Sequence, residues 1–162
     1  MFKKTLGLFF LLGTSHSIAA TSGPYLSGHG GFVSITDVEG GLGVGGQIGY
    51  HTGDLFGLDL SVTYTTAGPG KLNIPLALTT NVFEQNQLTT YLRFGGGFVA
   101  LHGTKFMLDF GFGGDFHANA NLSFGLVFRY DIVFDGQDQG LVLLRATYHL
   151  PGFGGEGDDI WD

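Results

Sequence analysis

After its first twenty residues, the chain consists of short segments in which apolar and polar residues alternate. In the third of these segments, Phe56, Leu58 and Leu60 alternate with Asp59 and Ser61. Successive side chains of a β-strand point to opposite faces, so each segment predicts a strand with one apolar and one polar face. The alternation predicts eight strands, at about residues 25–35, 41–51, 55–66, 72–83, 88–101, 106–117, 122–134 and 140–150.

The connections between these segments are short and rich in Gly, Pro, Asn and Asp, the residues that tight turns require. They are predicted at residues 36–40, 52–54, 67–71, 84–87, 102–105, 118–121 and 135–139. Pro75 lies inside the fourth segment and cannot donate a hydrogen bond to a neighbouring strand. We therefore expect an edge or a bulge at Pro75.

The composition of the two faces predicts which of them points outward. Eleven of the thirteen Phe after residue 20 lie at even positions on the apolar face, whereas the polar face carries Gly, Ser, Thr and a few charges. Lipid outside and a polar lumen inside require this distribution. A soluble β-sandwich is the competing fold, but its surface would need more Lys and Glu. We therefore predict an all-β fold, an eight-stranded antiparallel up-and-down transmembrane β-barrel that follows a signal peptide.

The first residues have the composition of a secretory signal peptide. Lys3 and Lys4 precede the apolar run Leu6–Leu12, and Ser17-Ile-Ala19 provides small residues at a cleavage site. We predict a signal peptide at 1–20, the barrel at 21–150 and an acidic, Gly-rich tail at 151–162. The chain has no Cys, which excludes lipoprotein acylation and disulfides. The predicted location is the bacterial outer membrane.

The net charge after residue 20 excludes nucleic acid as a partner. Five basic and fourteen acidic residues remain, which gives 5 − 14 = −9, whereas phosphate backbones require a basic surface. The expected partners are outer-membrane lipid, lipopolysaccharide and the barrel-insertion machinery, around a monomer. No cofactor is expected.

The stretch from Tyr91 to Phe134, and above all GFGGDFHANANLSFGLVFRYDIVF, resembles hairpins of small OmpA-type and OmpW-type outer-membrane barrels. The resemblance implies an outer-membrane location and eight strands, and it carries over no catalytic residue. Members of these families often end on an aromatic residue of the last strand. Here the last strand is expected to end near Leu150, with Trp161 as the alternative aromatic. The short connections lower the expectation of a receptor or an adhesin.

The charges on the inner face are the main candidate for a functional site. They occupy neighbouring strands, and an eight-stranded barrel is just wide enough for side chains to fill it. Unpaired charges there would be costly, so an ion-pair network that plugs the lumen is expected. The alternative is a narrow polar channel for small solutes. The predicted network consists of Asp59, Arg93, Asp109, Asp115, Arg129, Asp131 and Arg145.

The histidines of the chain offer an enzymatic or a metal site as an alternative. His29, His51, His117 and His149 are also expected to face the lumen. Asp115, His117 and either Ser61 or Ser123 could form an acyl-transfer triad. Some small outer-membrane barrels modify lipid A with such a triad, but on their lipid-facing side. No metal-ligand spacing is present, and the glycines of 41–46 precede no helix, so they do not form a dinucleotide site. We therefore expect no enzyme, no catalytic residue and no metal site.

Aromatic residues near the strand ends predict the girdles that mark the borders of the lipid bilayer. They are Tyr50, Phe56, Tyr64, Phe134 and Tyr148, and general lipid-facing bulk is the alternative reading of each. The function predicted from the sequence is a structural role in envelope integrity. The alternatives are the narrow channel and a lipid-modifying outer-membrane enzyme.

Overall fold

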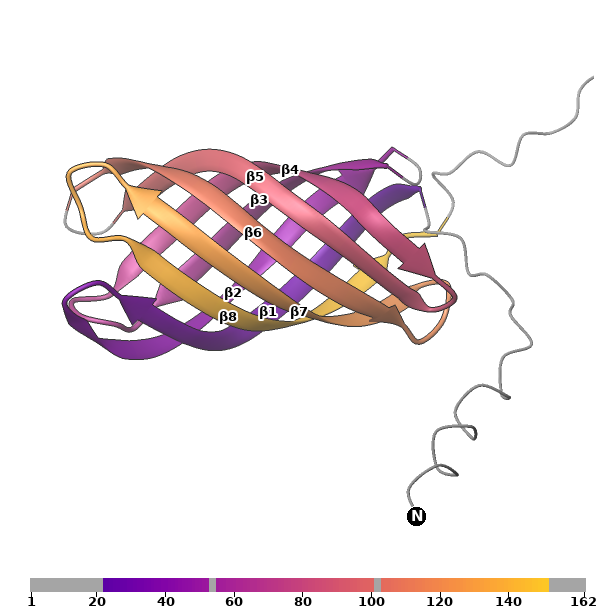
Figure 1. The fold of residues 1–162 in the computed structure, drawn as a ribbon, viewed down its shortest axis with the longest axis horizontal. Coiled ribbons are helices and arrows are strands. Elements are labelled where there is room, and N and C mark those ends of the chain that lie inside the picture. The colour runs from indigo at the N-terminus through magenta and orange to yellow at the C-terminus, as the bar shows by residue number, and fades with distance from the viewer. Residues whose placement is uncertain (1–21, 53–54, 101–102, 152–162) are drawn as a thin grey trace, which may run out of the picture.

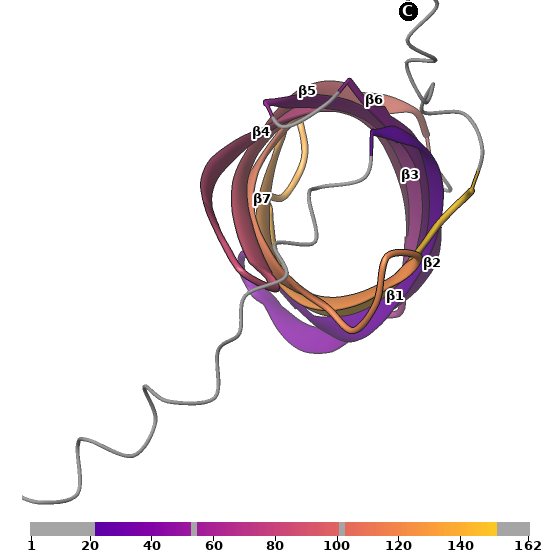
Figure 2. The same ribbon diagram turned by 90° about the vertical axis from the view of Figure 1, so that its right-hand side faces the viewer.

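The computed structural model describes residues 22–52, 55–100 and 103–151. They form a closed, antiparallel barrel of eight strands in chain order, in which β1 also pairs with β8. Figure 1 shows the inclined strands from the side, and Figure 2 shows the closed ring along its axis. The strands are β1 (Gly23–Ile35), β2 (Val38–His51), β3 (Phe56–Thr65), β4 (Lys71–Gln85), β5 (Leu88–Ala100), β6 (Lys105–His117), β7 (Leu122–Val133) and β8 (Gln139–His149).

The predicted fold class is confirmed, and the predicted strand limits agree with the structure to within a few residues. The predicted signal peptide and nearly all of the predicted tail lie outside the described residues. In the part of the chain that the structure describes, no helix has the length and apolar character needed to cross a membrane.

The two ends of the barrel differ in which connections they carry. The start of β1 and the end of β8 lie side by side, because Tyr25 pairs with His149. We call this the termini end; it also carries the connections 52–55, 86–87 and 118–121. We call the opposite end the far end; its connections are 36–37, 66–70, 101–104 and 134–138.

Two predicted connections are longer than those of the structure. The β1–β2 turn is only Thr36 and Asp37, because Val38 already pairs with Ile35. The β4–β5 turn is likewise reduced to Asn86 and Gln87. Asp37 and Asn86 adopt φ of 63° and 55°, a conformation that Asp and Asn tolerate better than most residues. The Gly and acidic residues that suggested longer loops therefore belong to paired strands.

Pro75 lies in the interior of a fully paired barrel, so the expectation of an edge at this position was wrong. It is paired with Gly97 of β5. On its other side, the β3–β4 register is interrupted between the pairs Leu60–Leu76 and Thr63–Asn73. Pro75 has no backbone N–H to donate, and it lies within this interruption of the β3–β4 pairing. The bulge of β4 lies further along, between Asn81 and Phe83.

Up to the bulge of β4 and along the other strands, odd-numbered residues point into the barrel and even-numbered ones point outward; after this bulge the odd-numbered Phe83 is exposed. Asp59, Ser61 and Thr63 are at most 1% exposed, whereas the neighbouring Leu58 and Leu60 are each more than 40% exposed. The large apolar side chains on the outside continue around all eight strands. An apolar exterior over a partly polar interior is the arrangement of a barrel in lipid.

Gly97→Ala is expected to lower the free energy of unfolding by about 1–3 kcal/mol, the usual cost of overpacking. A Cβ at Gly97 would lie 2.1 Å from the Ile74 backbone oxygen and 2.6 Å from Cα of Pro75. Gly28→Ala is the matched control, because a Cβ there meets no atom within 4 Å. Urea unfolding in lipid vesicles measures both variants. Equal losses at the two positions would contradict the close β4–β5 approach.

Candidate functional site: the charged lumen

A chain of alternating charges crosses the middle of the lumen. Arg93 of β5 holds Asp109 of β6 (Nε to Oδ1, 2.6 Å) and Asp59 of β3 (Nη1 to Oδ2, 2.9 Å). Its third nitrogen, Nη2, donates to the Ser61 hydroxyl at 3.2 Å. Arg93 is 5% exposed and both carboxylates are fully buried. One guanidinium thus ties three strands together through the interior.

Arg129 of β7 extends this chain of charges. Its Nε lies 3.1 Å from Oδ2 of Asp109, and its Nη2 donates to Oδ2 of Asp131 at 2.9 Å. Asn73 of β4 donates to the same Asp131 oxygen at 3.2 Å and to the Gln139 side-chain oxygen of β8 at 3.1 Å. We call Asp59, Arg93, Asp109, Arg129 and Asp131 the central network.

Gly111 makes room for the two arginines of the central network. It pairs with Arg93 on one side and with Arg129 on the other. A Cβ at this position would lie 2.7 Å from the Phe128 backbone oxygen and 3.7 Å from Cγ of Arg129. A larger residue would therefore crowd the arginine stem that reaches Asp109.

A separate charge pair lies nearer the termini end. Arg145 of β8 forms an ion pair with Asp115 of β6. The guanidinium carbon of Arg145 also lies 4.8 Å from the ring centre of Tyr91, within the range of a cation–π interaction. The seven predicted residues therefore all face the lumen, but they form two groups and not a single network.

Aromatic rings line the lumen towards the termini end. Tyr25 stacks on His51 with ring centres 4.9 Å apart and lies 5.9 Å from His149, which in turn lies 5.8 Å from His117. Between these rings and Arg145 there is a cavity of about 30 Å³. That volume suffices for about one or two water molecules.

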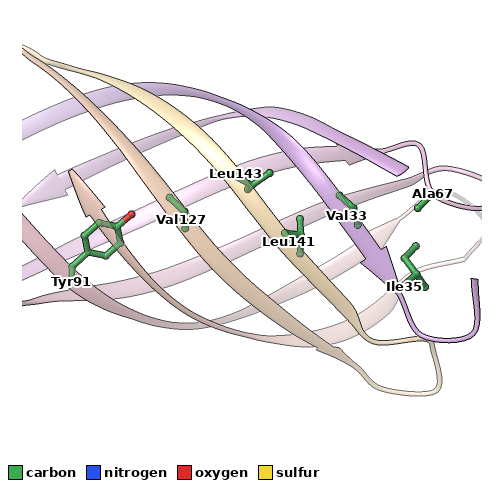
Figure 3. Packing of buried hydrophobic residues seen from close by; sticks show 7 residues of the cluster. All are labelled: Val33, Ile35, Ala67, Tyr91, Val127, Leu141 and Leu143. Carbon is green, nitrogen blue, oxygen red and sulfur yellow. The ribbon is translucent and has the colours of Figure 1, made fainter. Parts of the chain in front are cut away.

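Apolar side chains line much of the lumen towards the far end, beside the buried polar Asn73 and Gln139, which the sequence did not predict. Val33, Ile35, Leu141 and Leu143 point inward and are 2% exposed, and Ala67 lies with them (Figure 3). A second apolar cluster consists of Val99, Met107 and Val133. We call these eight residues the far-end apolar layer. The lumen is therefore partly apolar, with polar and charged side chains across its middle and towards the termini end. The sequence signal was the presence of large apolar residues at odd positions near the strand ends.

The alternative of an acyl-transfer triad is not assembled in the structure. His117 Nε2 hydrogen-bonds the Thr89 hydroxyl at 3.1 Å, while Ser123 approaches His149 at 3.5 Å. Ser61 is bonded to Arg93. The fourth lumen-facing histidine, His29, bonds the Thr63 hydroxyl at 2.9 Å. Within residues 22–52, 55–100 and 103–151, no group of three or more His, Asp or Glu side chains is arranged to hold a metal ion.

The five predicted girdle aromatics all face outward, with 42–57% of each side chain exposed. Tyr50, Phe56 and Tyr148 lie towards the termini end, and Tyr64 and Phe134 lie towards the far end. They are thus divided between the two ends of the barrel, and their role as girdles stays a prediction.

Comparison with known proteins identifies the architecture. No family model and no curated protein matches the sequence. Solved structures match over most of the chain. The fold is that of the small outer-membrane β-barrels.

The similar structures match this chain over nearly their whole length, but their sequences differ widely from it. Neisserial surface protein A is 17% identical, with a TM-score of 0.65 over 80% of this chain and 98% of its own. The N-terminal barrel domain of Pseudomonas aeruginosa OprF is 14% identical, with the same TM-score over 80% and 98%. The outer membrane protein OprG of the same organism is 11% identical, with a TM-score of 0.57 over 82% and 99%. The predicted resemblance to small outer-membrane barrels is confirmed at the level of the fold.

Proposed function

We propose that the protein is an integral outer-membrane barrel that contributes to the integrity of the cell envelope and does not catalyse a reaction. The observation that carries this proposal is the difference between the two faces of the sheet. The outer face is apolar, and the charged side chains of the inner face form ion pairs with one another. Open sheet edges cannot be left unpaired in lipid, and this barrel is closed through β1 and β8. The partners we propose are the surrounding lipid, lipopolysaccharide and the insertion machinery, with the barrel as a monomer.

The lumen supports a structural role better than a channel. The central network crosses the barrel from β3 to β7, and the far-end apolar layer packs beside it, with Leu141 paired with Arg129. A cavity of only about 10 Å³ lies beside Arg93, Arg129 and Arg145, which is at the lower limit for one water molecule. A conducting path would require the side chains of the central network and of the far-end apolar layer to move.

A lipid-modifying activity has less support. Its nucleophile would have to reach lipid, but Ser61 and Ser123 are at most 1% exposed and face the lumen. His149 approaches Ser123, yet its Nδ1 has no hydrogen-bond partner among the described residues. The third member that orients the base in a triad is therefore missing.

Membrane fractionation followed by gel electrophoresis without boiling tests the proposed location and fold. We expect the protein in the outer-membrane fraction, and we expect the unboiled band to migrate differently from the boiled band. A closed barrel resists detergent unfolding because all of its strands are paired. Recovery without detergent in the periplasm, with one band position before and after boiling, would favour the soluble sandwich instead.

The same purified protein tests the plugged lumen. In planar bilayers we expect no conductance steps above the baseline of protein-free membranes. Reproducible steps that disappear when the protein is omitted would replace the structural proposal by the channel. Lipid A isolated from overexpressing cells is expected to keep its mass, which tests the enzyme alternative.

A further inference from the structure

The exposed positive charge of the barrel is concentrated at one place. The described residues contain five basic side chains other than histidine, and the three arginines are buried in the lumen. The other two, Lys71 and Lys105, are the first residues of β4 and β6 and lie at the far end. Both line the same cavity, which measures about 430 Å³. Its volume lies within the range of small-molecule sites.

The inner side of this cavity is apolar. Val99 and Val133 line it and are each 6% exposed, with the fully buried Met107 in the same cluster. Val99 lies on β5, between the strands of the two lysines, and is paired with Lys105 itself. The two ammonium groups therefore flank an apolar floor.

The lysines retain hydrogen-bonding capacity for a ligand. Lys105 Nζ contacts the backbone oxygen of Asp135, which leaves further donors, since an ammonium has three. Lys71 and Lys105 carry like charges at the same cavity, and a bound anion would offset both charges. Asp135 also lines the cavity and is the competing acid. Asp138 is already used, because it accepts from the Tyr130 hydroxyl and from the Val133 amide.

We propose that this cavity binds a small aliphatic carboxylate. The carboxylate lies between Lys71 and Lys105, and the short hydrocarbon chain lies on Val99 and Val133. An acid without a chain would lose the apolar contacts, and a neutral molecule with the same chain would lose the two charge-assisted hydrogen bonds. The site thus requires both parts of the ligand. It lies outside the central network and does not depend on whether the lumen conducts.

Hexanoate is the probe for this site. Methyl NMR of the folded, full-length barrel in zwitterionic detergent is expected to show saturable shifts at Val99, Val133 and Met107. Lys71→Gln and Lys105→Gln are each expected to weaken the apparent affinity at least tenfold, and acetate and hexanol are expected to bind at least tenfold more weakly. Asp37→Asn is the matched control, since it changes one charge at the same end outside the cavity and should not weaken binding. The unboiled gel shift verifies the fold of every variant.

Two outcomes would overturn the proposal. The first is a shift that survives both lysine substitutions or that appears equally at the lipid-facing methyls of Val44 and Val62, because it would reflect partition into the micelle. The second concerns a phosphate of the surrounding lipid. If lipopolysaccharide in nanodiscs displaces hexanoate and alone shifts the Val99 and Val133 methyls in a lysine-dependent manner, the natural occupant is a lipid phosphate and not a small carboxylate.

Discussion

Arg93→Met is expected to lower the free energy of unfolding by about 3–5 kcal/mol, the range for removing one partner of a buried ion pair. The substitution replaces the aliphatic stem of Arg93 by an unbranched apolar side chain but leaves Asp59 and Asp109 without their shared guanidinium. Asp109 retains Arg129 at 3.1 Å. Asp59 is fully buried and has no other ion pair among the described residues. The cost therefore arises chiefly from a carboxylate buried without a counter-charge.

Urea unfolding in phospholipid vesicles, followed by the unboiled gel shift, measures this loss. Lys105→Met is the matched control, because it removes the same charge from an exposed position and is expected to change stability by no more than about 0.5 kcal/mol. Similar losses for Arg93→Met and Lys105→Met would show that the central network does not stabilise the barrel.

A second substitution separates the burial of an unpaired charge from the loss of packing. Asp59→Asn in the Arg93→Met background removes the unpaired carboxylate while keeping its shape. It is expected to recover part of the lost stability, with a coupling energy of about 0.5–3 kcal/mol between the two positions. Strictly additive effects would mean that Arg93 stabilises the barrel through packing and not through its charge.

The strands and their two faces could be predicted from the sequence because both follow from a period of two. The alternation of Leu58, Asp59, Leu60 and Ser61 determines which side of the sheet each residue occupies, whatever the rest of the chain does. The inward position of Arg93, Arg129 and Arg145 followed from the same parity. Parity could not predict that Pro75 would lie in the interior of the sheet, because this depends on an interruption in the β3–β4 ladder.

The partners across the lumen could not be predicted in the same way. Which aspartate meets which arginine depends on the stagger of the strands around the closed barrel. This stagger places Asp59 of β3 beside Arg93 of β5, two strands away, and it places Asp115 of β6 beside Arg145 of β8. The far-end apolar layer was missed for a related reason. Leu141 and Val33 occupy odd positions, which places them in the lumen. That they pack together follows only from the β1–β8 register, in which the two residues are paired.

Phe94→Arg is expected to cost about 2–4 kcal/mol of the free energy of unfolding in a lipid bilayer, because a charge at the middle of a transmembrane strand faces hydrocarbon. Phe94 lies near the centre of β5, is 55% exposed and packs against Phe110 with ring centres 5.1 Å apart. The same substitution at Phe134, which is 49% exposed at the far end, is expected to cost no more than about 1 kcal/mol.

The contrast between these two positions decides which environment surrounds the barrel. Both variants lose an exposed phenylalanine that packs against a neighbouring ring, so loss of aromatic packing alone predicts similar costs. Only hydrocarbon around the middle of the barrel makes the central position more costly than the rim. Unfolding of both variants in vesicles therefore tests the membrane assignment directly, and equal costs at Phe94 and Phe134 would argue that the apolar exterior does not lie in lipid.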